Sequence, residues 1–265
     1  MRFSISNIAW NQERDEEMYG VLARMNFEGL EIAPTRVFGD DPYSKCKEAR
    51  EWSSHLKKNY GLSISSIQSI WYGKNENIWS SEGERQSLIE YTKRAIDFAH
   101  VIECRNLVFG CPRNRNRNVN TSYDVATEFF CEIGDYAKRN ETVIGIEANP
   151  PIYNTNYINT TIQAIELIDI VNSEGFKLNL DVGTMVQNEE TLEVINGTCE
   201  YINHVHISEP KLVLIQEREL HTQLAGFLSE NNYNGFISIE MSKCDNYHIE
   251  KAMCYVQRVF GNINR

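Results

Sequence analysis

The stretch VIGIEAN (143–149) has the pattern of a short buried strand with a polar or charged group near its carboxyl end, and three later stretches repeat it. These are KLNLDVG (177–183), INHVHIS (202–208) and FISIEMS (236–242). In each, large apolar residues alternate with small, polar or charged ones. Side chains of a strand point alternately to the two faces of a sheet, and a face covered by helices must be apolar. The polar set is therefore predicted to point to the side that no helix covers.

Outward from these stretches, strand-like and helix-like segments alternate along all 265 residues. Apolar residues at helical spacing predict helices at 81–102, 122–139, 159–175 and 246–261. Eight strand–helix units of roughly 33 residues predict a single (β/α)8 TIM barrel over 1–265. An open doubly wound sheet is the alternative, but no Gly-x-Gly-x-x-Gly follows a strand. The predicted strands are 2–8, 27–32, 62–68, 104–110, 142–148, 176–182, 201–207 and 235–241.

The composition limits the kinds of partner and the cellular location that we expect for this protein. A formal net charge of −11 argues against a nucleic-acid partner, whose phosphates it would repel. We expect no membrane span, because no uncharged apolar window is long enough, and no signal peptide, because the first residues lack an apolar segment. The seven cysteines are scattered without a Cys-x-x-Cys pair, which predicts reduced thiols and a cytoplasmic protein.

Four inward-pointing groups fall near the carboxyl ends of the last four strands: Glu147, Asp181, His206 and Glu240. Barrel enzymes place their catalytic groups at this end. Two like charges about 4 Å apart cost about 4 kcal/mol at an effective dielectric near 20, so three carboxylates there favour a bound cation. One divalent metal ion is predicted, with Mn²⁺ favoured by the oxygen-rich donors and Mg²⁺, Co²⁺ or Zn²⁺ as alternatives. Taken singly, each residue could instead cap a helix or form a loop salt bridge.

The segments GIEANP (145–150), LNLDVGT (178–184), HVHISEP (204–210) and SIEMS (238–242) resemble, in order and spacing, the sugar phosphate isomerase/epimerase family of xylose isomerase-like TIM barrels. GLEIAPT (29–35) and FGCPRNR (109–115) extend the resemblance to essentially the whole chain. That family also includes ketose 3-epimerases, hydroxypyruvate isomerases, inosose dehydratases and endonuclease IV.

The resemblance implies a metal held by Glu147, Asp181, His206 and Glu240, with both glutamates also acting as acid and base. It implies a metal-dependent isomerase or epimerase that removes a proton next to a carbonyl of a small carbohydrate and passes through an enediolate. Two carboxylates allow removal of the proton from one face and its return to the other. A dehydratase or lyase on the same scaffold, similar to inosose dehydratase, needs the same metal and base and is the first alternative. A catalytically silent sugar-binding barrel is the second.

Two positions depart from the family pattern. Thr184 stands where many members have a histidine, and Lys211 stands near the position of an arginine. We therefore expect a substrate preference that differs from that of a simple free-ketose epimerase. The full set of predicted substrate contacts is Glu31, Gln68, Arg115, Asn149, Thr184, Glu209 and Lys211, with Lys211 as an alternative partner of Glu209.

Arginines alternate at Arg113, Arg115 and Arg117, just after a predicted strand. They could hold an anionic group on the substrate, or form a solvated loop that pairs with nearby acids. Of the three, Arg115 matches the family pattern best. His204 shares the inward face with His206 one layer deeper, and we expect it to be a hydrogen-bonded core histidine. The identity of the substrate and the formation of a homo-oligomer stay open.

Overall fold

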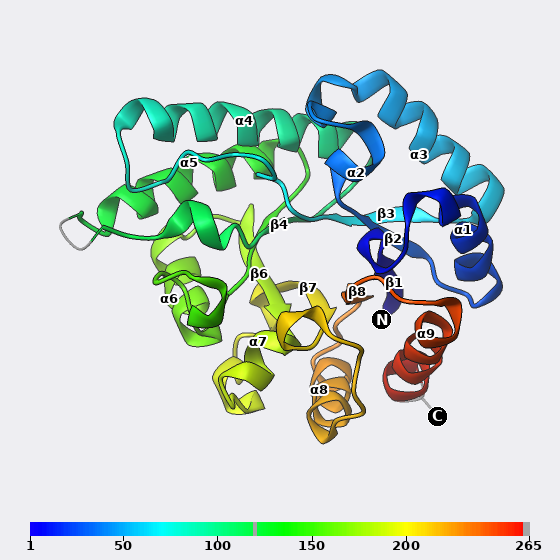
Figure 1. Ribbon diagram of the computed structural model, residues 1–265. Coiled ribbons are helices and arrows are strands. Elements are labelled where there is room, and N and C mark those ends of the chain that lie inside the picture. Colours follow the sequence, from blue (N-terminus) through cyan, green and yellow to red (C-terminus); the bar gives the residue numbers. More distant parts are fainter. Residues whose placement is uncertain (119–120, 262–265) are drawn as a thin grey trace.

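The computed structural model describes residues 1–118 and 121–261, and the eight strands within them close into a parallel barrel in the order β1 to β8 (Figure 1). The ring closes where β8 pairs with β1, with Ser238 opposite Ser4. This confirms the predicted TIM barrel. Each strand is shorter than predicted, by about one to four residues at its ends. The strands are β1 Arg2–Ser6, β2 Gly29–Ile32, β3 Ser63–Ile67, β4 Leu107–Phe109, β5 Ile144–Ile146, β6 Phe176–Asp181, β7 Ile202–Ile207 and β8 Phe236–Ile239.

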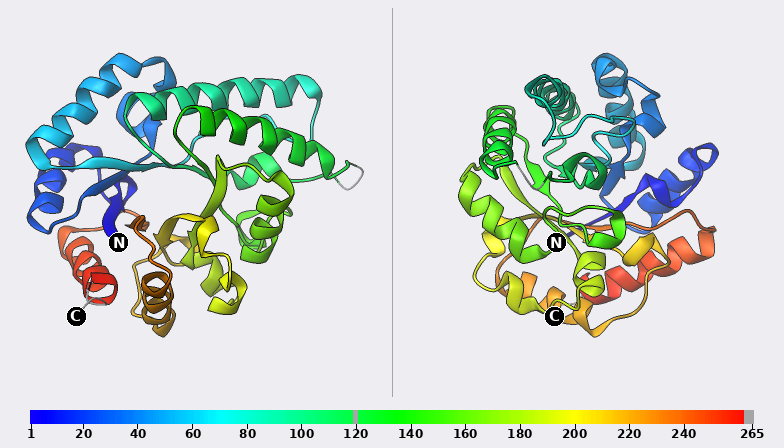
Figure 2. Two further views of the ribbon diagram at one scale, coloured as in Figure 1. Left: turned by 180° about the vertical axis from the view of Figure 1, so that it is seen from behind. Right: turned by 60° about the vertical axis from the view of Figure 1, so that its left-hand side comes forward.

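Helices surround the barrel and cover the outer face of its strands (Figures 1 and 2). The long helices are α1 Asp15–Arg24, α3 Cys46–Tyr60, α4 Glu82–Val101, α5 Asp124–Arg139, α6 Thr161–Val171, α8 Glu219–Glu230 and α9 Asn246–Gly261, and the short ones are α2 Pro34–Phe38 and α7 Val182–Gln187. Two of these helices begin at capping residues. At the start of α4 the Ser81 hydroxyl accepts from the Glu84 amide, and at the start of α6 Thr160 forms a capping box with Gln163. In the part of the chain that the structure describes, no helix is both long and apolar enough to cross a membrane.

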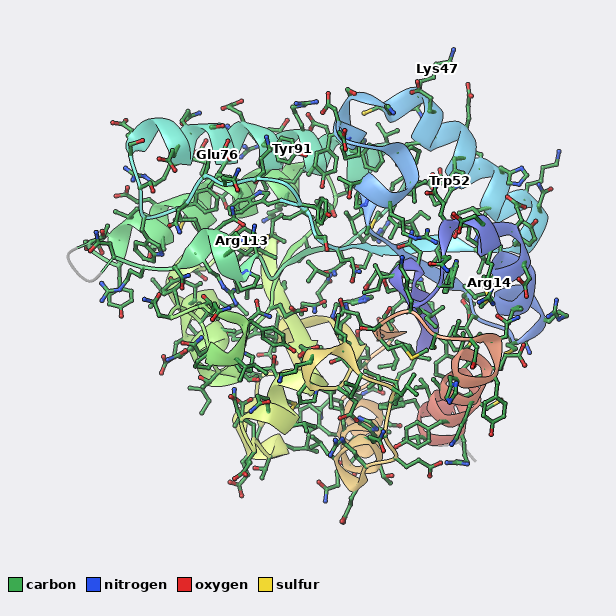
Figure 3. The ribbon with its side chains drawn as sticks, in the orientation of Figure 1. Arg14, Lys47, Trp52, Glu76, Tyr91 and Arg113 are labelled. Carbon is green, nitrogen blue, oxygen red and sulfur yellow. The ribbon has the colours of Figure 1, made fainter. Side chains whose placement is uncertain are left out.

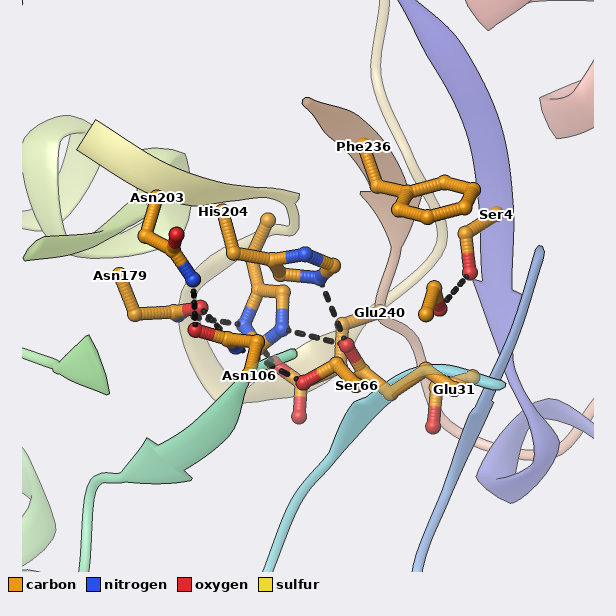
Figure 4. Close-up of polar contacts among 12 residues, drawn as sticks. Ser4, Glu31, Ser66, Asn106, Asn179, Asn203, His204, Phe236 and Glu240 are labelled. Carbon is orange, nitrogen blue, oxygen red and sulfur yellow. Dashed lines mark hydrogen bonds and ion pairs between the residues drawn. The ribbon is translucent and has the colours of Figure 1, made fainter. Parts of the chain in front are cut away.

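The two faces of the strands differ as the alternation predicts. Ile146, Leu180 and Val205 are fully buried in the apolar core between strands and helices. The barrel interior holds hydrogen-bonded polar residues. The Asn106 amide donates to Ser66 Oγ at 2.9 Å and accepts from Asn203 at 2.8 Å (Figure 4). Because a buried polar group is costly without a partner, this network forms a rigid floor beneath the carboxyl-end groups.

Candidate metal and catalytic site

The four predicted ligands meet at the carboxyl end of the barrel. Asp181 is the last residue of β6 and His206 lies within β7, while Glu147 and Glu240 directly follow β5 and β8. Each offers one ligand atom, and these four atoms all lie within 4.8 Å of one another. The backbones of both glutamates still bond to the neighbouring strand, with the Glu147 amide 3.1 Å from Phe109 O and the Glu240 amide 3.0 Å from Ile207 O. These hydrogen bonds of the barrel therefore fix the backbone position from which each glutamate side chain extends.

His206 stands at the centre of the cluster. Its Nδ1 lies 3.1 Å from Oε2 of Glu147 and 3.3 Å from Oε2 of Glu240. Its Nε2 faces away, 2.9 Å from Oε2 of Glu31. The side chains of Glu147 and Glu240 keep exposed fractions of 11% and 14%, whereas His206 and Glu31 are fully buried. The two glutamates thus keep some exposure, as Asp181 does, whereas His206 and Glu31 do not.

Glu147 is fixed on both of its oxygens. Asn179 Nδ2 donates to Oε2 at 2.9 Å, and Asn149 Nδ2 donates to Oε1 at 2.9 Å. Arg115 orients Asn149, because its Nη2 donates to Asn149 Oδ1 at 2.7 Å while its Nη1 donates to the Glu147 carbonyl at 2.8 Å. The carboxylate is therefore held by amides that are themselves anchored, which limits its rotation.

Asp181 is held by the turn that follows it. As the N-cap of α7 it accepts from the Thr184 amide at 2.6 Å, and its other oxygen accepts from Ser208 Oγ at 2.5 Å. Gly183 permits this close approach, because a Cβ there would lie 2.7 Å from Ser208 Oγ. The sequence Asp-Val-Gly-Thr thus positions one oxygen of Asp181 by a helix cap and the other by a neighbouring hydroxyl.

The cluster is electrostatically strained without a cation. Burial raises the pKa of Glu240 to about 7, although the neighbouring His206 opposes this shift. Burial, together with the charge of Glu147, raises the pKa of Asp181 to about 6. Burial alone would lower the pKa of His206, but the Glu31 and Glu240 carboxylates outweigh it and hold that pKa well above 6.5. The site offers three carboxylate oxygens and one imidazole nitrogen, and these raised pKa values reflect their burial close to one another. This donor set fits a divalent cation, which would relieve the same repulsion.

Three of the predicted substrate contacts lie beside the cluster. Asn149 bonds to Glu147 as described. With its amide nitrogen turned to the carboxylates, Gln68 donates to Oε1 of Glu240 and to Oε1 of Glu31, each at 2.7 Å. Thr184 is 2% exposed, and its hydroxyl donates to the Ala148 carbonyl at 2.8 Å. The structure thus brings these three together with the ligands, although their polar groups already bond to the protein.

Four others are placed differently. Glu31 and Arg115 are fully buried behind the cluster, where the Glu31 carboxylate bonds to two histidines and Gln68, and the Arg115 guanidinium bonds to Asn149 and to two carbonyls. Glu209 is 2% exposed and pairs with Arg218, at 2.7 and 2.5 Å, where the sequence offered Lys211 as a partner. Lys211 is exposed, and its amide donates to the Tyr153 hydroxyl at 2.7 Å.

The three loop arginines do not act as a group. Arg113 is exposed on the turn after β4 and lies on the same side of the molecule as Glu76 of the β3–α4 loop (Figure 3). Arg117 donates to the Thr121 carbonyl at 2.7 Å, and its guanidinium stacks on Tyr123 at 4.1 Å. With Arg115 turned inward, the three side chains offer no shared anion site.

Sequence reasoning gave no role to Tyr153, Asn179 or Ser208. Burial raises the pKa of Tyr153, and the charges of Asp181, Glu240 and Glu147 raise it further. Asn179 lies on the inward face of β6, and Ser208 directly follows β7 in the same alternation, so the pattern carried a signal for both. Tyr153 ends a three-residue 3-10 helix, Pro151–Tyr153, which is too short for any periodicity to indicate which way a side chain points.

A family model described as "Xylose isomerase-like TIM barrel" matches residues 20–254. The chain belongs to this family. Solved structures share the fold at low sequence identity. The 3-keto-D-glucoside 4-epimerase of E. coli is 18% identical, with a TM-score of 0.74 and 98% of each chain covered. The D-psicose 3-epimerase of Clostridium cellulolyticum H10 is 15% identical, with a TM-score of 0.80 and coverage of 98% of this chain and 99% of the other.

A further member of this structural group is a D-tagatose 3-epimerase-like protein, which is 19% identical with a TM-score of 0.78. It is covered over 98% of its length by the whole of this chain. Among curated proteins, no sequence matches this one significantly.

Proposed function

We propose that this protein is an enzyme that epimerises or isomerises a small carbohydrate by moving a proton on a carbon next to a carbonyl. In this proposal Glu147 and Glu240 exchange the proton, and together with Asp181 and His206 they hold one divalent ion, Mn²⁺ being the ion that the donor set favours. The observation that carries it is the pair of carboxylates next to one imidazole nitrogen, 3.1 and 3.3 Å from it, both of which keep some exposure.

A divalent ion bound there polarises the carbonyl and makes the neighbouring C–H more acidic. The protein supplies the proton transfer. Glu147 is held in one orientation by Asn149 and Asn179. One carboxylate can then remove the proton and the other can return it, so that the stereocentre inverts through an enediolate.

The comparisons support the reaction class. The similar structures include epimerases that act on ketoses and on a keto-glucoside, and all share the whole length of this barrel. Among the described residues, no contact in the site favours a dehydratase, which is the alternative on the same scaffold. Lys211 lies exposed in the loop after β7, and its amide bonds to the Tyr153 hydroxyl, so it is the proposed contact for an anionic group on the substrate. Asn149, Gln68 and Thr184 are the proposed neutral contacts.

The test uses Mn²⁺ titration and turnover together. Purified protein is expected to bind about one Mn²⁺ per chain, and Mn²⁺ at about 100 times its Kd should add about 2.7 kcal/mol of stability over chelator-treated protein. With a panel of ketoses and 3-keto-glucosides in D₂O, turnover should place one deuterium on the carbon next to the carbonyl. Glu147→Gln and Glu240→Gln should each lower kcat by about 10²–10⁴. Glu174→Gln, on an exposed ion pair with Lys138, is the matched control.

Each contrary result has a separate meaning. A Glu147→Gln/Glu240→Gln double variant that retains turnover would refute the roles of the two glutamates. If neither the stability nor the turnover of the protein responds to Mn²⁺, the proposed role of the cation is refuted. Product that has lost water would establish the dehydratase alternative, and tight sugar binding without turnover would establish a silent binding barrel.

A further inference from the structure

Glu31 lies on the far side of His206 from the barrel mouth, and its carboxylate is fully occupied by protein donors. Its Oε2 lies 2.9 Å from Nε2 of His206 and 2.9 Å from Nε2 of His204 (Figure 4). Its Oε1 accepts from the Gln68 amide at 2.7 Å. Glu31 is 0% exposed and His204 is 1% exposed. A side chain in this position does not reach a substrate, so its role must be exerted through the residues that it touches.

The contact determines which nitrogen of His206 is available to a cation. An ionised carboxylate only accepts hydrogen bonds, so the ring nitrogen facing it must carry the hydrogen. With the hydrogen on Nε2, neutral His206 has its lone pair on Nδ1. That atom is the one that faces Glu147 and Glu240. Carboxylates that accept from the far nitrogen of a histidine are a general means of orienting a metal ligand.

The same three residues, Glu31, His204 and His206, could also be considered a second metal site, since their ligand atoms lie close together. Their geometry favours hydrogen bonds. The nitrogen–oxygen distances of 2.9 Å are those of direct N–H···O contacts, whereas two ligand atoms each about 2.0–2.2 Å from a tetrahedral Zn²⁺ would lie about 3.3–3.6 Å apart. A cation there would also require His206 to bridge two ions.

We propose that Glu31 is a positioning residue for the cation site, because it fixes the tautomer and the ring orientation of His206. His204 and Gln68 hold Glu31 in place. Gln68 also donates to Oε1 of Glu240 at 2.7 Å, so one hydrogen-bonded chain connects two of the four ligands. This inference rests on the proposed cation site and adds a residue that lies outside the ligand group.

The test compares Mn²⁺ affinity by calorimetric titration in wild type, Glu31→Gln and Ser65→Ala. Glutamine keeps the size of Glu31 but loses the charge and one acceptor oxygen, so affinity should fall about 10–100-fold. Ser65→Ala removes a different interior hydrogen bond, the 2.5 Å contact with Ser4, which has no link to His206. The control should bind Mn²⁺ as wild type does, with its circular dichroism unchanged.

A second measurement reads the tautomer directly. In Zn²⁺-loaded wild type, ¹⁵N NMR of the imidazole nitrogens should show His206 protonated at Nε2 and metal-bound at Nδ1. In Glu31→Gln the Nε2–H should exchange faster with solvent, which a purely structural loss of packing elsewhere would not produce.

The outcomes separate the inference from the proposed function. If wild type binds no Mn²⁺, the cation site itself is refuted. If wild type binds Mn²⁺ and folded Glu31→Gln binds it equally well, the role of Glu31 is refuted. Two ions in wild type, one of them lost in Glu31→Gln, would instead establish the second metal site. Should Glu31→Gln fail to fold, His204→Phe removes one donor to Glu31, and unchanged affinity in that variant would also overturn the inference.

Discussion

Replacing His221 by glutamine is expected to remove part of the loss of stability that the protein undergoes in acid. His221 lies in the first turn of α8 and is 0% exposed. Its Nδ1 lies 2.9 Å from the hydroxyl of Tyr255 in α9, and its Nε2 has no hydrogen-bond partner among the described residues. Burial lowers the pKa of His221 to about 4, although the charge of Glu209 opposes the shift.

The sign and size of this effect on the free energy of unfolding follow from the pKa of His221 in the unfolded and in the folded protein. The unfolded chain takes up a proton at His221 below its ordinary pKa of 6.5, but the folded protein does so only near 4. The free energy of unfolding therefore falls as the pH drops through this window. Each unit of difference between the two pKa values is worth about 1.4 kcal/mol, so the contribution reaches about 3 kcal/mol. For a chain of this size that corresponds to a Tm change of about 6–12 °C.

Urea unfolding of wild type and His221→Gln at pH values of about 4.5 and 7 measures the effect. Other groups titrate in the same range, so the comparison is between the change in the free energy of unfolding with pH in wild type and the same change in His221→Gln. Exposed His55 supplies the control, because His55→Gln should keep the wild-type slope. Equal slopes for wild type and His221→Gln would show that the folded protein accepts a proton at His221 without cost, and that the burial argument fails.

Two further predictions concern the scaffold of the site. Gly183→Ala should weaken Mn²⁺ binding about 10–100-fold, because the new Cβ would lie 2.7 Å from Ser208 Oγ and displace a partner of Asp181. Unchanged affinity in a calorimetric titration would contradict this prediction. The control is Gly226→Ala, whose new Cβ would meet nothing within 4 Å. Arg115→Lys should lower the free energy of unfolding by about 3 kcal/mol, because one ammonium cannot replace a guanidinium that bonds to both Glu147 O and Asn149. Urea denaturation measures the loss, and a change below about 1 kcal/mol would show that these bonds contribute little.

The main features of the barrel and its ligand group could be predicted from local patterns. Alternation along VIGIEAN and KLNLDVG placed Glu147 and Asp181 on the inward face, and the structure has both there. This works because a strand has only two faces, and the outer one must be apolar beneath a helix. The same alternation predicted that His204 would be a hydrogen-bonded core residue, which its contact with Glu31 confirms.

The sequence by itself determined which residues face inward and how they are ordered around the barrel. Only the tertiary structure decided which of them face the open mouth and which face protein. Glu31 and Glu240 occupy equivalent positions in the alternation of their strands. His204, His206 and Gln68 nevertheless enclose Glu31, whereas Glu240 keeps some exposure. Arg115 looks like an anion-binding residue in its motif, yet it bonds to groups 32 to 43 residues further along the chain. Periodicity specifies a direction from the backbone, whereas partners and burial depend on side chains brought close only when the barrel closes.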